Sequence, residues 1–418
     1  MNELIKQRIE QIRRGEVPEG YKKTKVGVVP NDWEENRLSH YLKVNNDKNV
    51  DLKYGKEDVF SISGELGIVN QIELLGRSYA GASVAPYGIV YPNDVVYTKS
   101  PLKANPYGII KTNKTGKVGI VSTLYAVFHC KENVSPNFVQ TYFEWDKNLN
   151  NYLYPIVNIG AKHDMKISDE NSLKGYVVFP HRSEQEKIAE ILSMQDKLIS
   201  LKEKLIEEKK RQKKALMQQL LTGKKRLPGF SDTWRTSKLS NVLVEGSKIG
   251  VTDTSLYKKM TVKLAFKGLE FTKTDREMVD TRPFYIRNKN EIIIGKQNYF
   301  NGSVALVTDE FDGCICSNAI MSFSVKNADV KFILEYISQT DFMKKREMLA
   351  NGTGQKELSE KDFLNFDILL PCIDEQKRIG AIASTYDSEI LLLQKELDQE
   401  KQKKKALMQL LLTGIVRV

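Results

Sequence analysis

The sequence predicts an α/β protein with two globular parts that contain small twisted sheets, two long antiparallel coiled-coil helices that separate them, and an internal pseudo-two-fold repeat. Three observations lead to this prediction. One segment of eleven residues occurs twice, two stretches of 39 residues have helical character, and short β-branched runs alternate with turn residues elsewhere. Because the chain has 418 residues, at least two domains are expected.

The internal repeat is visible as matching segments at a fixed spacing. Residues 213–223 read KKALMQQLLTG, and residues 404–414, which lie 191 positions later, read KKALMQLLLTG. Further landmarks recur in both halves: Pro180 and Pro371, Glu184–Gln185 and Glu375–Gln376, and a W-x4-L-S segment that begins at Trp33 and at Trp234. So many matching positions indicate a tandem duplication, in which each copy is a variable globular part followed by a similar helix.

The two similar segments are predicted to be long helices. Residues 184–222 contain no glycine or proline, and residues 375–413 contain only Gly380. Gly223 and Gly414 follow directly, at the position where a helix commonly ends on a residue with left-handed backbone. Each segment is therefore expected to be one continuous helix.

Apolar spacing predicts that these helices pair with each other in antiparallel orientation. The second helix has a heptad seam: Ile379, Ala383, Tyr386, Ile390, Leu393 and Leu397. The first helix places Gln195 and Lys202 in its corresponding seam, so we expect an imperfect apolar zipper. A second stripe of the first helix, formed by Ile191, Leu198 and Leu205, is expected to contact another protein.

The predicted organisation has five parts. Short β-branched runs indicate α/β globular domains, and segments 134–150 and 329–349 indicate short helices with aromatic anchors. The predicted boundaries are 1–22 for an N-terminal helical segment, 23–183 for the first globular domain, 184–222 for the first long helix, 223–374 for the second globular domain, and 375–418 for the second long helix with the C-terminal tail. Since residues 413–417 parallel residues 222–226, the chain end is expected to return to the N-terminal entry segment.

Charge and composition narrow the possible functions. Lys and Arg total 64 and Asp and Glu total 53, so the net charge of +11 favours polyanionic partners, nucleic acid first and acidic membrane surfaces second. No apolar run approaches the roughly 20 residues that cross a bilayer, and the N-terminus has no signal-peptide core. A cytoplasmic protein without a membrane partner is expected. Four cysteines in a chain of this length exclude a disulfide scaffold.

The motifs that catalysis or metal binding would need are incomplete. Asn105–Gly108 lacks the second proline of the (D/N/S)PP(Y/F) turn of methyltransferases, and Gly352–Gly354 lacks the third glycine of a dinucleotide-binding loop. Cys314 and Cys316 have no further ligands nearby in sequence, whereas a zinc site needs four, so core thiols are favoured. We expect a non-catalytic binding or targeting protein with no metal site and no cofactor in this chain.

An acid-free basic stretch in the first half favours DNA binding. From Val95 to Lys131 there is no Asp or Glu, and three tyrosines lie among the lysines of this stretch. Lysine ammonium groups neutralise phosphates and release counterions. For any single residue a solvated basic loop is the alternative. The predicted DNA-contacting residues are Lys99, Lys103, Lys111, Lys114 and Lys117, with His163 beside a basic loop and its neighbour Lys162.

The second half contains residues suited to base recognition. Residues 281–308 hold several cations and only Glu291 as an acid. Arginine reads guanine, and asparagine or glutamine reads adenine, through paired hydrogen bonds. The predicted DNA-contacting residues of this half are Arg282, Arg287, Lys296, Gln297, Asn298, Asn301, Gln355 and Lys356.

Taken together, these residues resemble the specificity subunit of type I restriction–modification systems. The matching features are P-x3-E-Q at the start of each long helix, K-K-x-L-M-x-x-L-L-T-G at its end, the W-x4-L entry after each basic segment, and the turn at residues 352–359. The first half departs from the last feature, since residues 160–163 read GAKH. The resemblance covers essentially the whole chain.

The resemblance implies more than the residues alone. Each globular domain would be a target recognition domain that reads one half of an asymmetric bipartite sequence in double-stranded DNA. The helices would hold the domains apart and dock two methylation subunits, which carry S-adenosylmethionine and methylate adenine. Restriction subunits would add cleavage that depends on ATP and Mg. The chain would act in a prokaryotic cytoplasm as a non-catalytic targeting subunit.

Three other classes of function remain as alternatives. A fused methyltransferase or nuclease would need the missing catalytic motifs. A coiled-coil interaction or scaffold protein with non-specific DNA binding would not need two divergent basic domains. Association with membranes through the basic helices would need a wider apolar face with tryptophan.

Overall fold

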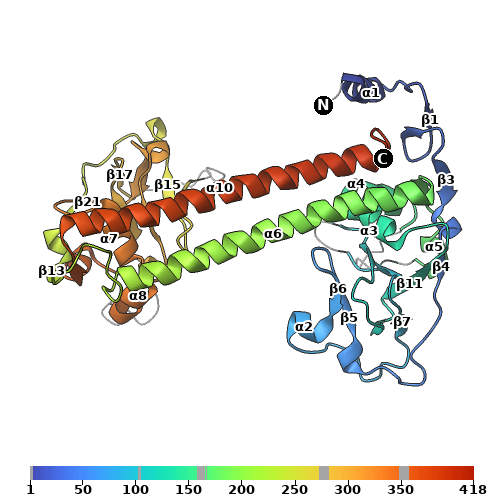
Figure 1. The fold of residues 1–418 in the computed structure, drawn as a ribbon, viewed down its shortest axis with the longest axis horizontal. Coiled ribbons are helices and arrows are strands. Elements are labelled where there is room, and N and C mark those ends of the chain that lie inside the picture. The colour runs from blue at the N-terminus through green and yellow to red at the C-terminus, as the bar shows by residue number, and fades with distance from the viewer. Residues whose placement is uncertain (1–2, 102–104, 158–164, 166, 273–281, 348–356) are drawn as a thin grey trace. The chain divides into compact units, whose positions relative to one another are not determined.

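The computed structural model describes residues 3–101, 105–157, 165, 167–272, 282–347 and 357–418, and Figure 1 labels its elements. The chain divides into two compact units, residues 1–201 with 397–418 and residues 202–396. Each unit contains small antiparallel sheets and helices, which confirms the predicted α/β class with two sheet-bearing parts. Both long helices contribute residues to both units.

The first unit is organised around a four-stranded antiparallel sheet in the order β4-β11-β8-β9, with the two-stranded pairs β1-β2, β3-β12, β5-β6 and β7-β10. Its strands are β1 (Tyr21–Lys23), β2 (Val28–Pro30), β3 (Glu34–Arg37), β4 (Leu42–Val44), β5 (Phe60–Ser63), β6 (Gly67–Asn70), β7 (Gly88–Val90), β8 (Val95–Thr98), β9 (Ile110–Thr112), β10 (Gly119–Val121), β11 (Tyr125–Cys130) and β12 (Tyr176–Phe179). Its shorter helices are α1 (Glu3–Arg13), α2 (Gln71–Leu75), α3 (Pro136–Glu144), α4 (Asp146–Leu153) and α5 (Asp169–Ser172).

The second unit repeats this plan. Its four-stranded sheet has the order β14-β21-β18-β19, and its two-stranded pairs are β13-β22, β15-β16 and β17-β20. The strands are β13 (Arg235–Lys238), β14 (Leu243–Glu245), β15 (Met260–Val262), β16 (Leu269–Phe271), β17 (Phe284–Ile286), β18 (Ile292–Gly295), β19 (Val304–Leu306), β20 (Ile315–Ser317), β21 (Ile320–Val325) and β22 (Asp367–Leu370). The helices are α7 (Val330–Ile337), α8 (Thr340–Glu347) and α9 (Glu360–Leu364). The duplication therefore includes the globular parts, whose sequences match only loosely.

One inner strand of each main sheet, β8 or β18, is almost entirely buried. All four residues of β8 are buried, as are Ile292, Ile293 and Ile294 of β18. A continuous apolar run is typical of a strand that is covered on both faces. Each strand follows an asparagine with left-handed backbone, Asn93 (φ 69°) or Asn290 (φ 67°), a conformation that asparagine tolerates better than most residues.

The two long helices are α6 (Arg182–Leu220) and α10 (Ile373–Leu411), each of 39 residues. Both begin and end two residues earlier than the sequence predicted. The last turns are closed by bonds from the Gly223 amide to the Leu220 carbonyl and from the Gly414 amide to the Leu411 carbonyl. Both glycines have left-handed backbone, so the predicted terminating role of glycine is confirmed.

Within each unit, segments of α6 and α10 pack together and their polar positions are paired. Gln195 is 6% exposed, and its amide donates to the carbonyl and carboxylate of Glu400 in the first unit. In the second unit Lys202 lies 2.6 Å from the carboxylate of Glu396. The polar residues that were predicted to weaken an apolar zipper thus each contact a glutamate of α10, while the heptad geometry itself stays a prediction.

Each unit also ties its long helices to its sheet domain by one repeated charge network. In the second unit the Lys213 ammonium lies 2.8 Å from Asp387 of α10 and 2.7 Å from Glu335 of α7. In the first unit Lys404, the counterpart of Lys213 at a spacing of 191, lies 2.5 Å from Asp196 of α6 and 3.7 Å from Glu144 of α3. The network was not predicted, because its carboxylates come from distant segments.

A second repeated arrangement, here called the Trp–Glu–Arg cluster, joins the start of one long helix to the tail that follows the other. In the first unit Glu184 accepts hydrogen bonds from the indole of Trp33 and the guanidinium of Arg417, which also binds Asp32. The contact between Arg417 and Asp32 confirms that the C-terminal tail returns to the N-terminal entry segment. In the second unit Glu375 accepts from the Trp234 indole and from the Nε and Nη2 atoms of Arg226.

Replacing Glu184 by Ala should lower the free energy of unfolding of the full chain by about 2–3 kcal/mol, because the buried indole of Trp33 and the Arg417 guanidinium would lose their acceptor. Asp32→Ala, which removes an exposed partner of the same arginine, should cost less than about 1 kcal/mol. Denaturant melts of the two variants give both values. Equal costs would contradict the central role of Glu184.

The contact between Asp32 and Arg417 predicts that the stability of the fold depends on pH in the acid range. The hydrogen bond from Arg417 holds the pKa of Asp32 below its ordinary value. A carboxyl with a lowered folded pKa stabilises the folded state above its unfolded pKa, about 3.9, and loses this contribution as pH falls through the folded value. The stability difference between wild type and Asp32→Ala should therefore be constant near neutral pH and shrink below about pH 4.

Candidate nucleic-acid interface

The predicted basic residues of the first half fall into different environments. Lys114 and Lys117 are exposed in the turn between β9 and β10, whereas Lys111 in β9 is only 7% exposed. Lys99, at the end of β8, pairs with Asp169 at 2.5 Å and keeps only 17% of its side chain exposed. Predicted contacts Lys103, Lys162 and His163 lie outside the described residues.

The β9–β10 turn is held in one conformation by a buried asparagine. The Asn113 side chain donates to the carbonyls of Tyr91 and Lys117 and accepts from the Thr115 amide and hydroxyl. This arrangement fixes the backbone that carries Lys114 and Lys117. A pre-ordered loop loses less conformational entropy on binding, so this turn is a suitable place for phosphate contacts.

Lys111 and Arg287 are buried, so neither side chain is placed to contact DNA. Burial lowers the pKa of Lys111 despite the nearby carboxylate of Glu144. Arg287 is 3% exposed and donates to the Cys316 sulfur and the Ser247 carbonyl. Both side chains are buried, Lys111 within β9 and Arg287 directly after β17, and the sequence pattern did not indicate the direction of either.

The other predicted residues of the second half gather at one turn. Lys296 follows β18 and pairs with Glu360 at 3.0 Å, and exposed Gln297 comes next. Asn298 and exposed Asn301 border a short helical turn, with a side-chain hydrogen bond of 3.2 Å between them. Arg282 is exposed just before β17, whereas Gln355 and Lys356 lie outside the described residues.

This amide-rich turn is anchored by Tyr299. Its ring is fully buried, and its hydroxyl donates to the Ile337 carbonyl at the end of α7. Gly302, with φ of 75°, closes the turn. Gln297 and Asn301 are thus presented to solvent from a rigid base, as amide side chains that read base edges must be.

The loops at equivalent places in the two units differ in charge. The β9–β10 turn of the first unit carries Lys114 and Lys117, while the matching β19–β20 loop of the second unit carries Asp309, Glu310 and Asp312. Lys289 pairs with Asp309 at 2.5 Å. Phosphate contact is therefore favoured at this position in the first unit only.

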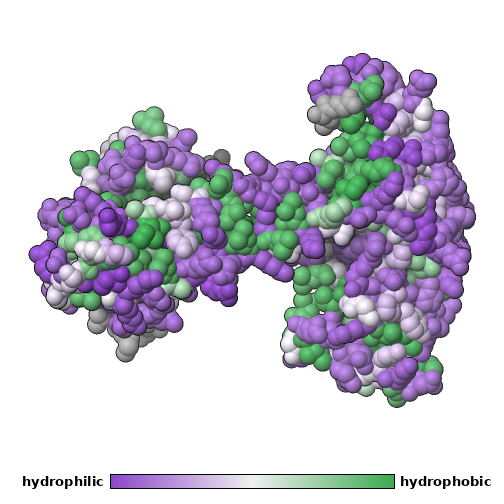
Figure 2. Space-filling model, in the orientation of Figure 1, coloured by the Kyte–Doolittle hydropathy of each residue, from purple (hydrophilic) through white to green (hydrophobic). Residues whose placement is uncertain are grey.

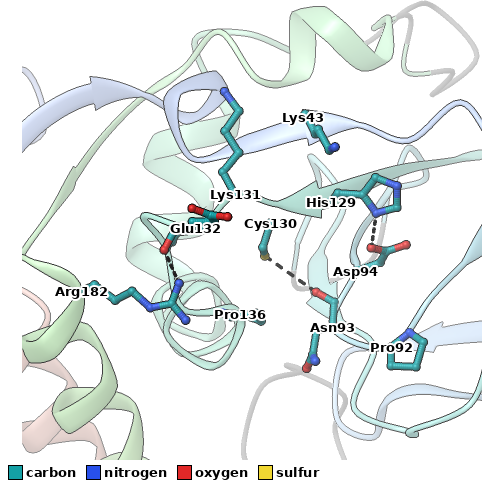
Figure 3. A pocket seen from close by; sticks show the side chains of 11 residues that line it. Lys43, Pro92, Asn93, Asp94, His129, Cys130, Lys131, Glu132, Pro136 and Arg182 are labelled. Carbon is teal, nitrogen blue, oxygen red and sulfur yellow. Dashed lines mark hydrogen bonds and ion pairs between the residues drawn. The ribbon is translucent and has the colours of Figure 1, made fainter.

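A pocket of about 540 Å³ in the first unit was missed by sequence reasoning (Figure 3). It lies between the β4–β11 edge, the start of α3 and the start of α6, and its charged lining includes Lys43, Asp94, His129, Lys131, Glu132 and Arg182. The Nδ1 atom of His129 lies 2.6 Å from the Asp94 carboxylate. No local motif could reveal this pocket, because strand pairing and helix docking bring its residues together.

Neither a metal-ligand cluster nor a membrane-spanning helix is present in the part of the chain that the structure describes. No group of three or more His, Cys, Asp and Glu side chains there could hold a metal ion. Cys314 and Cys316 are buried free thiols. None of the described helices has the length and apolar character to cross a bilayer.

Comparisons with known proteins place the paired, loop-bearing units beside DNA specificity subunits. Residues 231–401 match the family described as "Type I restriction modification DNA specificity domain". A putative type I restriction enzyme specificity subunit, MjaX of Methanocaldococcus jannaschii, is 25% identical over 96% of this chain and 97% of its own length. The MjaVIII specificity subunit of the same organism is 26% identical over 58% of this chain and 62% of its length. The match within the second half and the alignment with MjaX thus make this chain similar to type I restriction enzyme specificity subunits.

Solved structures share the fold. The S subunit of a type I restriction–modification system from M. genitalium matches with a TM-score of 0.53 and 14% identity, over 91% of this chain and 96% of that one. A chain from a structure described as explaining assembly and conformational transition of the type I system matches with a TM-score of 0.52 and 14% identity, over 93% and 99%. At this identity the likeness shows the shared architecture alone.

Replacing Lys111 by Met should leave the free energy of unfolding unchanged or raise it by up to about 1 kcal/mol, because a buried ammonium is exchanged for an apolar side chain of similar length. Lys117→Met, at an exposed site, should stay within about 0.5 kcal/mol of wild type. Because the folded pKa of Lys111 is lowered, wild type should gain stability relative to the variant as pH rises toward the unfolded value near 10.4. Urea melts at several pH values measure both effects.

Proposed function

We propose that each sheet domain is a target recognition domain that reads one half of an asymmetric bipartite sequence in double-stranded DNA. The observation that carries this proposal is that the two units share one fold but differ in the charge of their loops. The main sheets have matching strand orders, yet one unit presents a basic turn where the other presents acids. Two copies of one scaffold with different loops suit two different half-sites.

The long helices are proposed to dock two methylation subunits. Leu201 of α6 and Leu392 of α10 occupy equivalent positions, 191 residues apart, and are 54% and 58% exposed. Figure 2 shows apolar surface over these helices among hydrophilic side chains. Further exposed apolar residues are Met194, Leu198 and Leu205 of α6 and Leu391 of α10. Exposed apolar residues repeated in both units favour two copies of one partner.

Chemistry is proposed to reside in the partners. Methylation subunits would supply S-adenosylmethionine and transfer methyl groups to adenine, and restriction subunits would supply cleavage with ATP and Mg. This chain would act without catalysing either reaction, in a prokaryotic cytoplasm. Its contribution would be to position both partner copies relative to the two half-sites.

The function is tested by mapping methylated bases in DNA from cells that express the chain with its methylation subunit. A methylated adenine in each half of one asymmetric split motif is expected. Exchanging residues 234–374 for those of another specificity subunit should change one half of the motif and leave the other. Methylation that ignores sequence, or DNA binding without any preferred site, would instead support a scaffold with non-specific affinity.

The double variant Lys114→Ala/Lys117→Ala should weaken DNA binding by the assembled complex almost equally for all sequences. Each lost phosphate contact should reduce the slope of log affinity against log salt by about 0.9, so a fall of about 1–2 is expected. Asp309→Asn/Glu310→Gln in the equivalent loop of the second unit is the matched control and should not reduce affinity. If the slope is the same in the lysine variant and wild type, the turn does not contact phosphate.

A further inference from the structure

The pocket beside the start of α6 combines nitrogen-bearing side chains from three separate parts of the first unit. Lys43 of β4 lies opposite His129 of β11 in the antiparallel register. Arg182 is the first residue of α6, and it faces the pocket from the other end (Figure 3). Topology alone thus places an ammonium, an imidazole and a guanidinium around one cavity of about 540 Å³.

The positively charged side chains of the pocket differ in whether they already have partners within the protein. The side chain of Lys43 is exposed, and within the part of the chain that the structure describes it has no hydrogen bond or ion pair. Arg182 bonds the Glu132 carbonyl and pairs with Glu186, and Lys131 donates to the Ser39 carbonyl. Lys43 is therefore the cation most available to a ligand.

The negative groups of the pocket are partly neutralised. The Asp94 carboxylate contacts His129 and accepts from the Tyr91 amide and the Asn45 side chain, so its charge is directed into the protein. Burial raises the pKa of the Cys130 thiol to about 12, so this side chain adds no negative charge near neutral pH. Glu132 remains as the carboxylate that opposes the cations.

The second unit shows that the fold does not require these cations. The strand pair that carries Lys43 opposite His129 corresponds to β14 and β21, where Val244 lies opposite Ser324. The counterpart of Arg182, 191 residues later and also first in its helix, is Ile373. Val244 and Ile373 are 46% and 40% exposed, so one scaffold carries cations in one copy and apolar side chains in the other.

We propose that the pocket formed by Lys43, His129 and Arg182 binds a phosphate group, and that in the DNA complex this group is a backbone phosphate beside the first half-site. The assignment of DNA as its source rests on the proposed function. Lys and Arg are the side chains that neutralise phosphates, and an imidazolium can donate from its second nitrogen while the first contacts a carboxylate. The second unit would make no such contact, so the first half-site would be held by more phosphate contacts.

The test exchanges the pocket residues for those of the other repeat. Lys43→Val/His129→Ser/Arg182→Ile gives the first unit side chains with which the second unit folds. In the assembled complex, the salt slope of DNA binding should fall by about 1–2, and affinity near physiological salt should drop roughly tenfold or more. The methylated motif should stay the same in both halves, because phosphate contacts carry no sequence information.

Three controls distinguish loss of the pocket from a general loss of charge, from unfolding, and from binding of a phosphate that does not come from DNA. Lys6→Ala/Arg13→Ala removes two positive charges from exposed positions of α1, outside the pocket, and should leave the slope unchanged. If the triple variant unfolds, Lys43→Val alone, at an exposed residue, should still lower the slope by about 0.9. Inorganic pyrophosphate, tested by its effect on the melting temperature of the full chain, probes the pocket without DNA.

The outcomes are distinct. A pyrophosphate stabilisation that disappears in the variant, with an unchanged DNA slope, would assign the pocket to a free phosphate anion and overturn the DNA source. An unchanged slope together with no pyrophosphate effect in wild type would refute the phosphate site altogether. Failure of wild-type complex to methylate any preferred motif would count against the proposed function instead, whichever way the pocket variants behave.

Discussion

A buried glutamate at the start of each long helix organises this molecule. Glu184 and Glu375 each accept an indole N–H from the domain entry and a guanidinium from the tail that follows the other helix. An unpaired carboxylate at such a site would be costly, so helix start, entry segment and tail must come together in one geometry. Pairing this one acid in each unit therefore brings the domain entry, the helix start and the tail of the other helix together.

Because these contacts hold the long helices and sheets in both units, the loops can differ without loss of the fold. The Lys213 and Lys404 networks repeat the attachment of helices to sheet domain, and the sheets repeat their strand order. By contrast, the residues that face solvent at equivalent loops change sign or polarity between copies. Such a division between a constant frame and variable loops is what a protein needs if its two halves must read unrelated sequences.

The sequence was most informative where the repeat is strict. Segments at a spacing of 191 predicted both helices to within two residues and the contact of the tail with the N-terminal entry, because identical residues impose identical helix ends. Side-chain direction was not predictable for Lys111 and Arg287, since short strands with buried neighbours carry no clear alternation. The pocket around Lys43 and Arg182 was also hidden, because its members meet only after strands pair and α6 docks.

The opposite charges of the β9–β10 and β19–β20 loops also affect the timing of binding. Long-range attraction to a polyanion acts before any close contact forms, and it acts more strongly on a basic loop than on an acidic one. The first unit would therefore meet DNA earlier on average and leave it later, while the second samples sequence from an already tethered state. The two copies of one scaffold would thereby divide the work, with the first unit as anchor and the second as reader.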